Sequence, residues 1–338
     1  MSTLYIDRQG SELRIQTGVL HVSTPDGQGE RRLPLKYLDR VVLRTDTQLS
    51  SKVLCALAEQ GVSLIALGGR GGQQVAQITG TAHNDARRRW QQVLTLSQPE
   101  ACRQLALAIV QAKVKRQRQT LEHIATTRAD LRKPLFDGQE SLGRVLHTLH
   151  LPASRSALSL DQVRGLEGAA AAQYFQAYFC AFAPALGAHG RNRRPPRDPV
   201  NAVLSLAYTM LYGQATMACW AAGLDPALGA LHTLSHGRAA LACDLMEPLR
   251  PQVDLWVWQQ FRDGLLRAEH FGADGSGACL LGKAGRSHFY AAWEVLAKSQ
   301  QRSLQGYARA VAKAITQPLT DGSPGMAGHW AHLSAPEA

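Results

Sequence analysis

The stretch VNAVLSLAYTMLYGQATMACWAAGL, residues 200–224, decides the fold, because it is long, mostly apolar and free of charged side chains. A membrane-spanning helix needs roughly 20 such residues, so a membrane-associated helical protein is one interpretation. Asn201, Gly213 and Gln214 dilute the stretch, however, and Arg-rich sequence precedes it while an Asp-Pro turn follows. A helix that is apolar on all sides is also expected at the centre of a large helical domain. The sequence favours this buried central helix and predicts no membrane span.

Outward from this stretch, the chain after residue 82 is rich in Ala, Leu, Gln and Arg at helical spacing. Residues 84–97 and 100–124 are predicted to form its first two helices. Before residue 83, β-branched and alternating apolar segments predict short strands and one helix, at 48–61. The strands are expected at 3–7, 12–24, 31–38, 40–45 and 62–67. We therefore predict an α+β protein in which a small N-terminal β-rich domain, 1–82, precedes a larger all-α domain, 83–338.

The charge balance favours a polyanionic partner. The 338 residues include 37 Lys and Arg against 26 Asp and Glu, which gives a formal net charge of +11. Nucleic acid is the favoured partner, ahead of an anionic membrane surface. The first two helices of the α domain are also basic, a pattern that by itself is typical of a solvated helix face. The basic residues concerned are Arg87, Arg88, Arg89, Lys113, Lys115, Arg116 and Arg118.

The six cysteines are scattered along the chain and form no C-x-x-C pair. Their spacing argues against a disulfide framework and against a zinc ribbon, and it suits a reducing cytoplasm. The N-terminal residues MSTLYIDRQG show no basic flank followed by an apolar run, so no signal peptide is expected. The sequence thus predicts a cytoplasmic protein.

Acidic and histidine side chains gather in HTLSHGRAALACDLMEPLRP, residues 232–251. Asp244 and Glu247 are three positions apart, so they share one face of a helix and can reach one cation. Pro248 predicts that this helix kinks or stops just after Glu247. His232 and His236 are core residues in one interpretation and metal ligands in the other. Imidazole nitrogen with carboxylate oxygens suits Mn²⁺ or Mg²⁺, and the absence of thiolates disfavours structural zinc.

A further acid, Glu167, stands nearly alone in SLDQVRGLEGAAAAQYF, residues 159–175. Ser159 and Gln162 form an S-x-x-Q capping box, which places Glu167 two turns into a helix. An acid in so apolar a helix is costly unless it is paired or bound to a metal. The alternative to a metal ligand is an ion pair with Arg164, three residues earlier.

An arginine-rich loop is predicted just before the central helix. In RNRRPPRDPV, residues 191–200, prolines interrupt the arginines, while Asp198 and Pro199 are expected as the N-cap and first residue of the helix. A basic run alone is usually a solvated surface. Beside a metal constellation it favours phosphate contacts, for which the planar fork of arginine is suited. The candidates for holding DNA are Arg193, Arg194 and Arg197.

Three ordered segments carry a resemblance to a known family: RGLEGAAAAQYF (164–175), RNRRPPRDPVNAVLSLAYTMLY (191–212) and LGALHTLSHGRAALACDLMEPLRP (228–251). With these, essentially the whole chain resembles CRISPR-associated endonuclease one, the integrase subunit of spacer acquisition. The resemblance implies a β-rich domain for dimerisation and partner contacts, and a helical catalytic domain that binds DNA. It also implies a homodimer that acts with CRISPR-associated protein two to insert double-stranded DNA into a CRISPR array.

The same resemblance implies the metal ligands. The family ligands are the Glu of an R-G-x-E-G motif, the His that ends a G-x-x-H segment and the last acid of a D-L-M-E segment. These fall on Glu167, His232 and Glu247, with Asp244 binding directly or through water, whereas His236 matches no ligand. Mg²⁺ or Mn²⁺ held there would stabilise charge at phosphorus and activate a 3′ hydroxyl.

Three points stay open at the level of the sequence. The family often has Glu and Phe where this chain has Pro248 and Leu249, which leaves the local helix geometry unsettled. Tyr208 and Tyr212 are expected in the core, with a place beside the site as the alternative. The alternative to an enzyme is a non-catalytic DNA-binding scaffold, in which the acids only pair with arginine.

Overall fold

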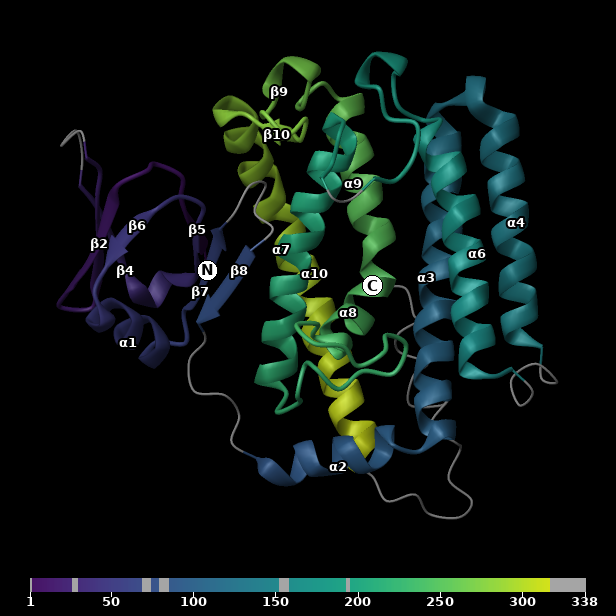
Figure 1. Cartoon of the computed structure of the whole chain (residues 1–338), viewed down its shortest axis with the longest axis horizontal. Helices are drawn as coiled ribbons and strands as arrows, with labels where there is room; N and C mark the ends of the chain where they lie inside the picture. Colours follow the sequence, from purple (N-terminus) through teal and green to yellow (C-terminus); the bar gives the residue numbers. More distant parts are fainter. Residues whose placement is uncertain are drawn as a thin grey trace. The chain divides into compact units, whose positions relative to one another are not determined.

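A computed structural model of the chain describes residues 2–25, 30–68, 74–78, 85–151, 158–192 and 195–316. The chain divides into two units. Unit 1 comprises Met1–Asn84 with Tyr290–Val295, and unit 2 comprises Asp85–Phe289 with Leu296–Ala338. Strands dominate the first unit and helices the second (Figure 1), which confirms the predicted fold class.

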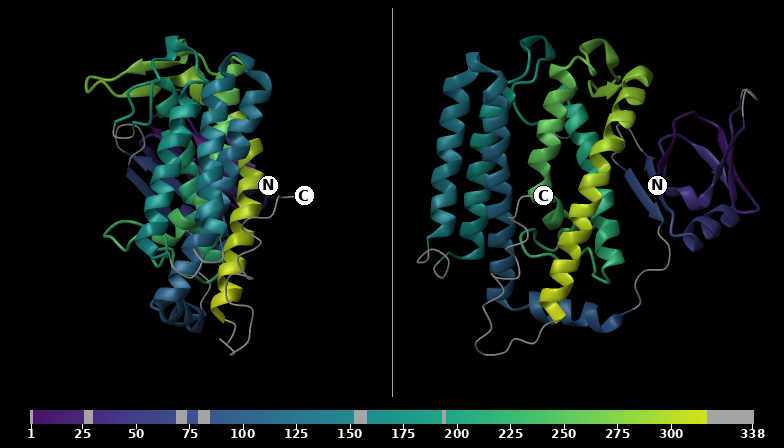
Figure 2. Two further views of the ribbon diagram at one scale, coloured as in Figure 1. Left: turned by 90° about the vertical axis from the view of Figure 1, so that its right-hand side faces the viewer. Right: turned by 180° about the vertical axis from the view of Figure 1, so that it is seen from behind.

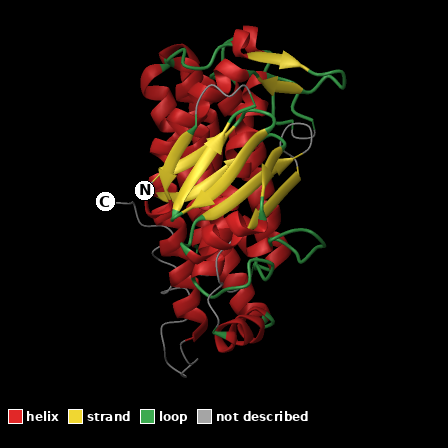
Figure 3. Cartoon of the chain, turned by 90° about the vertical axis from the view of Figure 1, so that its left-hand side faces the viewer, coloured by secondary structure: helices red, strands yellow, loops and turns green. Residues whose placement is uncertain are grey.

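Among the described residues, unit 1 contains two four-stranded sheets (Figure 3). The first has the order β1-β5-β7-β8, with β8 antiparallel to β7 and the other pairs parallel. Its strands are β1 (Ser2–Ile6), β5 (Leu38–Leu43), β7 (Ser63–Gly68) and β8 (Gln74–Ile78). The second has the order β4-β3-β2-β6, with β6 parallel to β2. Its strands are β2 (Ser11–Gln16), β3 (Val19–Ser23), β4 (Arg31–Pro34) and β6 (Thr47–Leu49).

The single strand predicted at 12–24 is in fact a hairpin of β2 and β3. Gln16 pairs with Val19 across a two-residue turn, in which Thr17 and Gly18 have φ of 50° and 73°. Two residues at positive φ suit a tight hairpin, and the usual sequence signal for this turn is Asn-Gly or Asp-Gly. Thr17 is β-branched, as strand residues often are, and it continues the alternation of apolar and polar side chains. The sequence pattern therefore predicted one strand through the turn.

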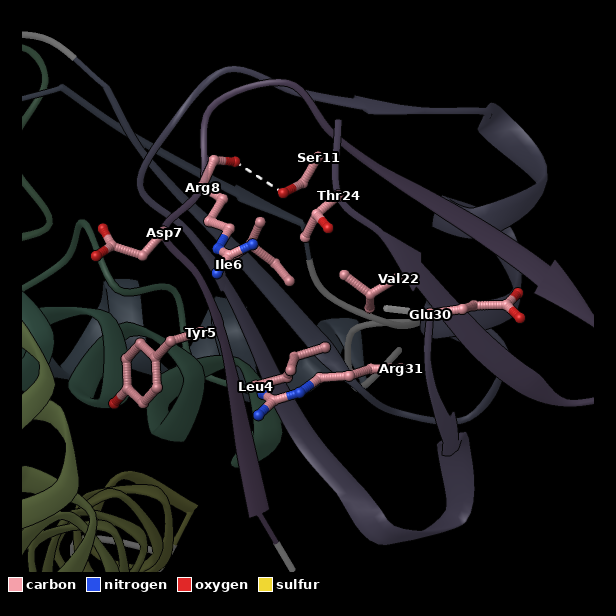
Figure 4. Close-up of a pocket in the computed structure, with 10 residues that line it drawn as sticks. All are labelled: Leu4, Tyr5, Ile6, Asp7, Arg8, Ser11, Val22, Thr24, Glu30 and Arg31. Atoms are coloured by element: carbon pink, nitrogen blue, oxygen red, sulfur yellow. Dashed lines mark hydrogen bonds between the residues drawn. The ribbon is translucent and has the colours of Figure 1, made fainter. Parts of the chain in front are cut away.

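The core of unit 1 comes from the apolar sides of its strands and of helix α1 (Ser51–Glu59). Leu13, Leu20, Val41, Val53 and Leu57 are all almost completely buried. Near this core a cavity of about 340 Å³ is lined by residues of β1, of β3 and of the segments beside them (Figure 4). The lining contains none of the predicted metal ligands. The predicted metal ligands all lie in unit 2.

Long helices build unit 2 (Figure 2). Its α-helices in the described residues are α2 (Ala86–Leu96), α3 (Pro99–Thr127), α4 (Arg132–His150), α6 (Leu160–Phe179), α7 (Pro199–Ala221), the short α8 (Ala240–Met246), α9 (Arg250–Arg262) and, apart from Tyr290–Val295, α10 (Lys283–Thr316). The exception to an all-α unit is a short hairpin of β9 (Phe271–Ala273) and β10 (Cys279–Leu281), which are antiparallel. Its turn is closed by Asp274, whose side chain accepts hydrogen bonds from the amides of Ser276 and Ala278.

Helix α7 is the buried helix predicted for residues 200–224. Asp198 caps it by accepting a hydrogen bond from the amide of Asn201 at 2.8 Å, and Pro199 begins it, as expected. Val200, Leu204 and Leu211 are fully buried, with no exposed surface. No helix in the described part of the chain has the length and apolar character needed to cross a membrane.

Helices α3, α4 and α6 lie side by side (Figures 1 and 2), and Gly138 allows their close approach. A Cβ atom at Gly138 of α4 would lie 2.7 Å from Cβ of Ala177 on α6 and 2.9 Å from Cδ1 of Leu121 on α3. Cβ atoms do not approach this closely, so the contact requires glycine. The packing matters for the site, because α3 and α6 supply two of its side chains.

A buried polar layer connects α6, α7 and α9 at Asp254. Tyr174 donates a hydrogen bond to its carboxylate at 2.9 Å, Tyr208 donates to the second oxygen, and Tyr178 donates to the main-chain carbonyl at 2.8 Å. Burial raises the pKa of Asp254 to about 6, although the bonds from Tyr208 and Tyr174 oppose the shift. The carboxyl group of Asp254 is thus well hydrogen-bonded, but its burial disfavours the ionised form.

We predict that Gly138→Ala lowers the free energy of unfolding by about 1–3 kcal/mol, because the added methyl forces α4 away from α6. Gly143→Ala is the matched control on the same helix, since a Cβ there meets nothing within 4 Å. It should be neutral or stabilising by up to about 1 kcal/mol. Urea denaturation of both variants checks this, and equal stabilities would contradict the close packing.

We also predict a pH dependence that Asp254→Asn removes. The folded pKa of about 6 exceeds the usual 3.8, so the folded protein binds more protons than the unfolded chain between these values. Its free energy of unfolding should therefore fall as pH rises from 4 to 7, by at most about 3 kcal/mol for this group. Urea denaturation at several pH values gives the difference between wild type and variant, and a difference that does not change with pH would contradict the assignment.

Candidate functional site

The loop that carries His232 is held in place by the buried carboxylate of Asp244 on α8. Asp244 accepts hydrogen bonds from the amides of Ala230 at 2.6 Å, Leu231 at 3.0 Å and His232 at 3.0 Å. The loop approaches α8 closely at Gly229, where a Cβ would lie 2.7 Å from Oδ2 of Asp244. The main chain around His232 is therefore set by one acid and one glycine.

Asp244 also orients the imidazole of His232. Its Oδ1 lies 2.7 Å from Nδ1 of His232. A carboxylate can only accept, so His232 donates from Nδ1, and in the neutral imidazole the lone pair is then on Nε2. Nε2 lies 3.7 Å from Oε1 of Glu247. A carboxylate that fixes the far nitrogen of an imidazole is the arrangement found behind metal-ligating histidines.

Glu247 lies where α8 ends, in a 3₁₀ turn formed by Glu247–Leu249, and its side chain is 4% exposed. Helix α8 ends at Met246, one residue before Glu247, where the position of Pro248 had predicted the end of the helix. Arg250 Nε lies 3.1 Å from Oε1. Lys113 Nζ lies 2.6 Å from Oε2. Burial acts to raise the pKa of Glu247, but the charges of Arg250 and Lys113 outweigh it and hold the pKa at about 2.

Glu167 projects from α6 and forms an ion pair with Lys113 of α3. The capping box of Ser159 and Gln162 that begins α6 is present, as predicted. The alternative pair with Arg164 is not formed, because Arg164 donates instead to Asp161 at 2.9 Å and to the carbonyl of Leu231 at 2.8 Å. The Lys113 ammonium thus contacts the carboxylates of both Glu167 and Glu247.

Lys113 was expected on a solvated helix face, and this is wrong: Lys113 and Arg116 are both buried, with 6% and 8% of the whole residue exposed. Lys113 follows Ile109 and Val110 by four and three positions, and both are fully buried. That spacing was the available signal for an inward-facing lysine. Burial acts to lower the pKa of Lys113, but Glu247 and Glu167 outweigh it and raise the pKa above its usual range.

Helix α3 also holds the segment that bears Glu247. Arg116 donates a hydrogen bond to the carbonyl of Pro248 at 3.0 Å, and Thr120 donates to the carbonyl of Pro251 at 3.0 Å. The guanidinium of Arg250 lies 4.8 Å from the ring centroid of Tyr208. Tyr208 is buried, as expected of a core residue, and it reaches the site through this contact.

Imidazole nitrogen and carboxylate oxygen suit a divalent cation in their chemistry, although Lys113 lies between the two glutamates. Two donors on one octahedral ion, at bond lengths of about 2.1 Å, lie about 3 Å apart when adjacent and about 4.2 Å apart when opposite. The 3.7 Å between His232 Nε2 and Glu247 Oε1 lies between these two values, so a small movement of either side chain would bring both donors onto one ion. The second oxygen of this carboxylate, Oε2, is in close ionic contact with Lys113 at 2.6 Å.

Within the described residues, no group of three or more His, Cys, Asp or Glu side chains is arranged to hold a metal ion. The physical reason is the ammonium of Lys113, which separates the carboxylates of Glu167 and Glu247. His232 and Glu247 face each other directly, whereas Glu167 joins them through Lys113. Asp244 is turned toward the loop amides and the imidazole.

The other predicted residues are exposed or lie outside the described residues. His236 is exposed in the loop that follows His232. Arg197 is exposed, and its amide donates to the side chain of Asn192 at 2.8 Å. Arg193 and Arg194 lie outside the described residues, so their contact with DNA stays a prediction.

The whole arrangement can be compared with known proteins. The family profile for CRISPR associated protein Cas1 matches residues 4–295. CRISPR-associated endonuclease Cas1 1 of Thermodesulfovibrio yellowstonii is 32% identical over 316 residues, covering 92% of this chain and 97% of that protein. A casposase bound to integration product shares the fold, with a TM-score of 0.76, 19% identity and 95% of each chain covered.

A chain of a Cas6-RT-Cas1-Cas2 complex also shares the fold, with a TM-score of 0.76 and 24% identity, over 93% of this chain and 35% of that chain. The structural matches cover 93–95% of this chain, and the sequence match to the Thermodesulfovibrio yellowstonii protein covers 92%. This chain belongs to the Cas1 family of CRISPR-associated endonucleases.

Proposed function

We propose that the chain is a metal-dependent DNA endonuclease and integrase, which inserts new DNA into a CRISPR array by attack of a 3′ hydroxyl on a phosphodiester. The observation that carries this proposal is the partly buried cluster of His232, Glu247 and Glu167, with Asp244 orienting the imidazole. The likeness to a casposase bound to integration product supports strand transfer as the reaction type.

The residues have separate roles in this proposal. His232 through Nε2, Glu247 and Glu167 would hold Mg²⁺ or Mn²⁺, which when bound supplies charge neutralisation at phosphorus and a more acidic hydroxyl. Asp244 keeps the proton of His232 on Nδ1, so that Nε2 stays available. Arg250 lies against Glu247 and keeps this carboxylate ionised at neutral pH.

The proposed partners are double-stranded DNA, a second copy of this chain and a small CRISPR-associated protein two dimer. The net charge of +11 supports a polyanionic partner. The likeness to a chain of a Cas6-RT-Cas1-Cas2 complex supports the protein partner. The exposed Arg197, with Arg193 and Arg194, is the proposed phosphate contact.

A non-catalytic DNA-binding scaffold is the second candidate. The observation that favours it is the ionic pairing of Glu167 and Glu247 with Lys113 and Arg250, which satisfies both acids without a metal. A scaffold would need neither a divalent cation nor a free 3′ hydroxyl. The following two experiments separate the candidates.

We predict that Glu167→Ala and His232→Ala each abolish Mn²⁺- or Mg²⁺-dependent cleavage of DNA. Asp244→Asn should lower it by about 10–100-fold, because the imidazole loses its charged partner. His236→Ala is the matched control, since this histidine is exposed in the adjacent loop and should keep most of the activity. Cleavage of a labelled duplex, with EDTA-treated protein and added Mn²⁺, measures the effect. Equal loss in both histidine variants would overturn the ligand assignment.

We also predict strand transfer when the partner protein and a repeat-containing plasmid are present. A short labelled duplex with free 3′ hydroxyls should become covalently joined to the plasmid, whereas the same duplex with dideoxy ends should not, because the attacking oxygen is missing. Denaturing gels detect the joined product. Joining by dideoxy ends, or nicking alone with every substrate, would leave a nuclease without integrase activity.

A further inference from the structure

Lys113 is a buried cation at the centre of the site. Its ammonium contacts the carboxylates of Glu167 and Glu247 from α3, while the stem of its side chain lies in the helical core. An isolated ammonium so far from water would be very costly. The two carboxylates offset that cost, and they would in turn be buried without a charge partner if Lys113 were apolar.

The charges of Glu167 and Glu247 are matched without any metal. Glu167 and Glu247 bring two negative charges, and Lys113 and Arg250 bring two positive charges in direct contact with them. Asp244 is bonded separately, to the loop amides and to His232. A divalent cation added to these matched charges would leave an excess of positive charge in a poorly solvated place. Lys113 and the cation therefore compete for the same two carboxylates.

The cluster is accessible from one side. The side chain of Glu167 is 25% exposed, compared with 8% for Lys113 and 4% for Glu247. The four-carbon stem of lysine is flexible, so its ammonium can move toward water past Glu167 without a change in α3. The fixed fork of arginine would be harder to displace from the same position.

We propose that Lys113 is a resident cation, which occupies the position between Glu167 and Glu247 in the metal-free protein and moves away when Mg²⁺ or Mn²⁺ binds. This inference rests on the proposed function. Lys113 keeps the metal-free site folded and lowers the affinity for the metal, so that the carboxylates are released only to a doubly charged ion. It is a positioning residue, because it acts through the ligands.

The test is Lys113→Met, which keeps the length of the side chain and removes its charge. Without metal, the melting temperature should fall below that of wild type, because Glu167 and Glu247 lose their shared partner. The affinity for Mn²⁺, measured by calorimetric titration, should rise about tenfold, since the competing charge is gone. Arg118→Met is the matched control: it removes one positive charge from an exposed position of α3 and should change neither quantity.

Melting temperatures measured over a series of Mn²⁺ concentrations cover the case in which Lys113→Met is unfolded without metal, because ligand binding stabilises the folded state by mass action. At saturating Mn²⁺ the variant should melt at the wild-type temperature or above it. Failure to fold even then would make Lys113 a structural residue and overturn the proposal. Mn²⁺ affinity equal to or weaker than that of wild type would overturn it as well. Absence of Mn²⁺ binding in wild type and in the variant would instead refute the proposed metal site.

Discussion

Charge that is taken out of water must be matched by charge or by hydrogen bonds, and this constraint shapes the helical unit. Its described part buries four acids: Asp198, Asp244, Glu247 and Asp254. Asp198 caps a helix, Asp244 accepts loop amides, and Asp254 accepts tyrosine hydroxyls. Glu247 is matched by charged side chains instead. Glu247 is therefore the acid whose partners another cation can most readily replace.

The remaining architecture serves to bring these groups together. The site draws side chains from α3, α6, the loop before α8 and the turn after α8, which are distant in sequence. Helix α3 contributes twice, because it supplies Lys113 and also fixes the segment of Glu247 through Arg116 and Thr120. Close packing at Gly138 keeps α6, with Glu167, beside α3. Displacement of one helix would thus alter several contacts at once.

The features of the fold that depend on neighbouring residues alone could be predicted from the sequence. Caps are local, so Asp198 and Ser159 identified the beginnings of α7 and α6. The hairpin turn at Thr17 was missed, because a threonine at positive φ carries no sequence signal. Lys113 was misplaced, because its burial depends on two acids that lie 54 and 134 positions further along the chain. Motifs identified the acids, but only the fold showed which cation pairs with them.

Main-chain hydrogen bonds explain the first three positions of the short G-x-x-H segment. Asp244 takes up the amides of residues 230, 231 and 232, so the bonds require an N–H at each place and no particular side chain. These bonds exclude proline at positions 230 and 231, because proline has no N–H to donate. Both positions are buried, so the remaining restriction is on the size of the side chain. Glycine is needed at 229 for lack of space, and histidine at 232 for its chemistry. The spacing of the motif therefore follows from the hydrogen bonds that the carboxylate of Asp244 accepts, although Asp244 itself lies outside the motif.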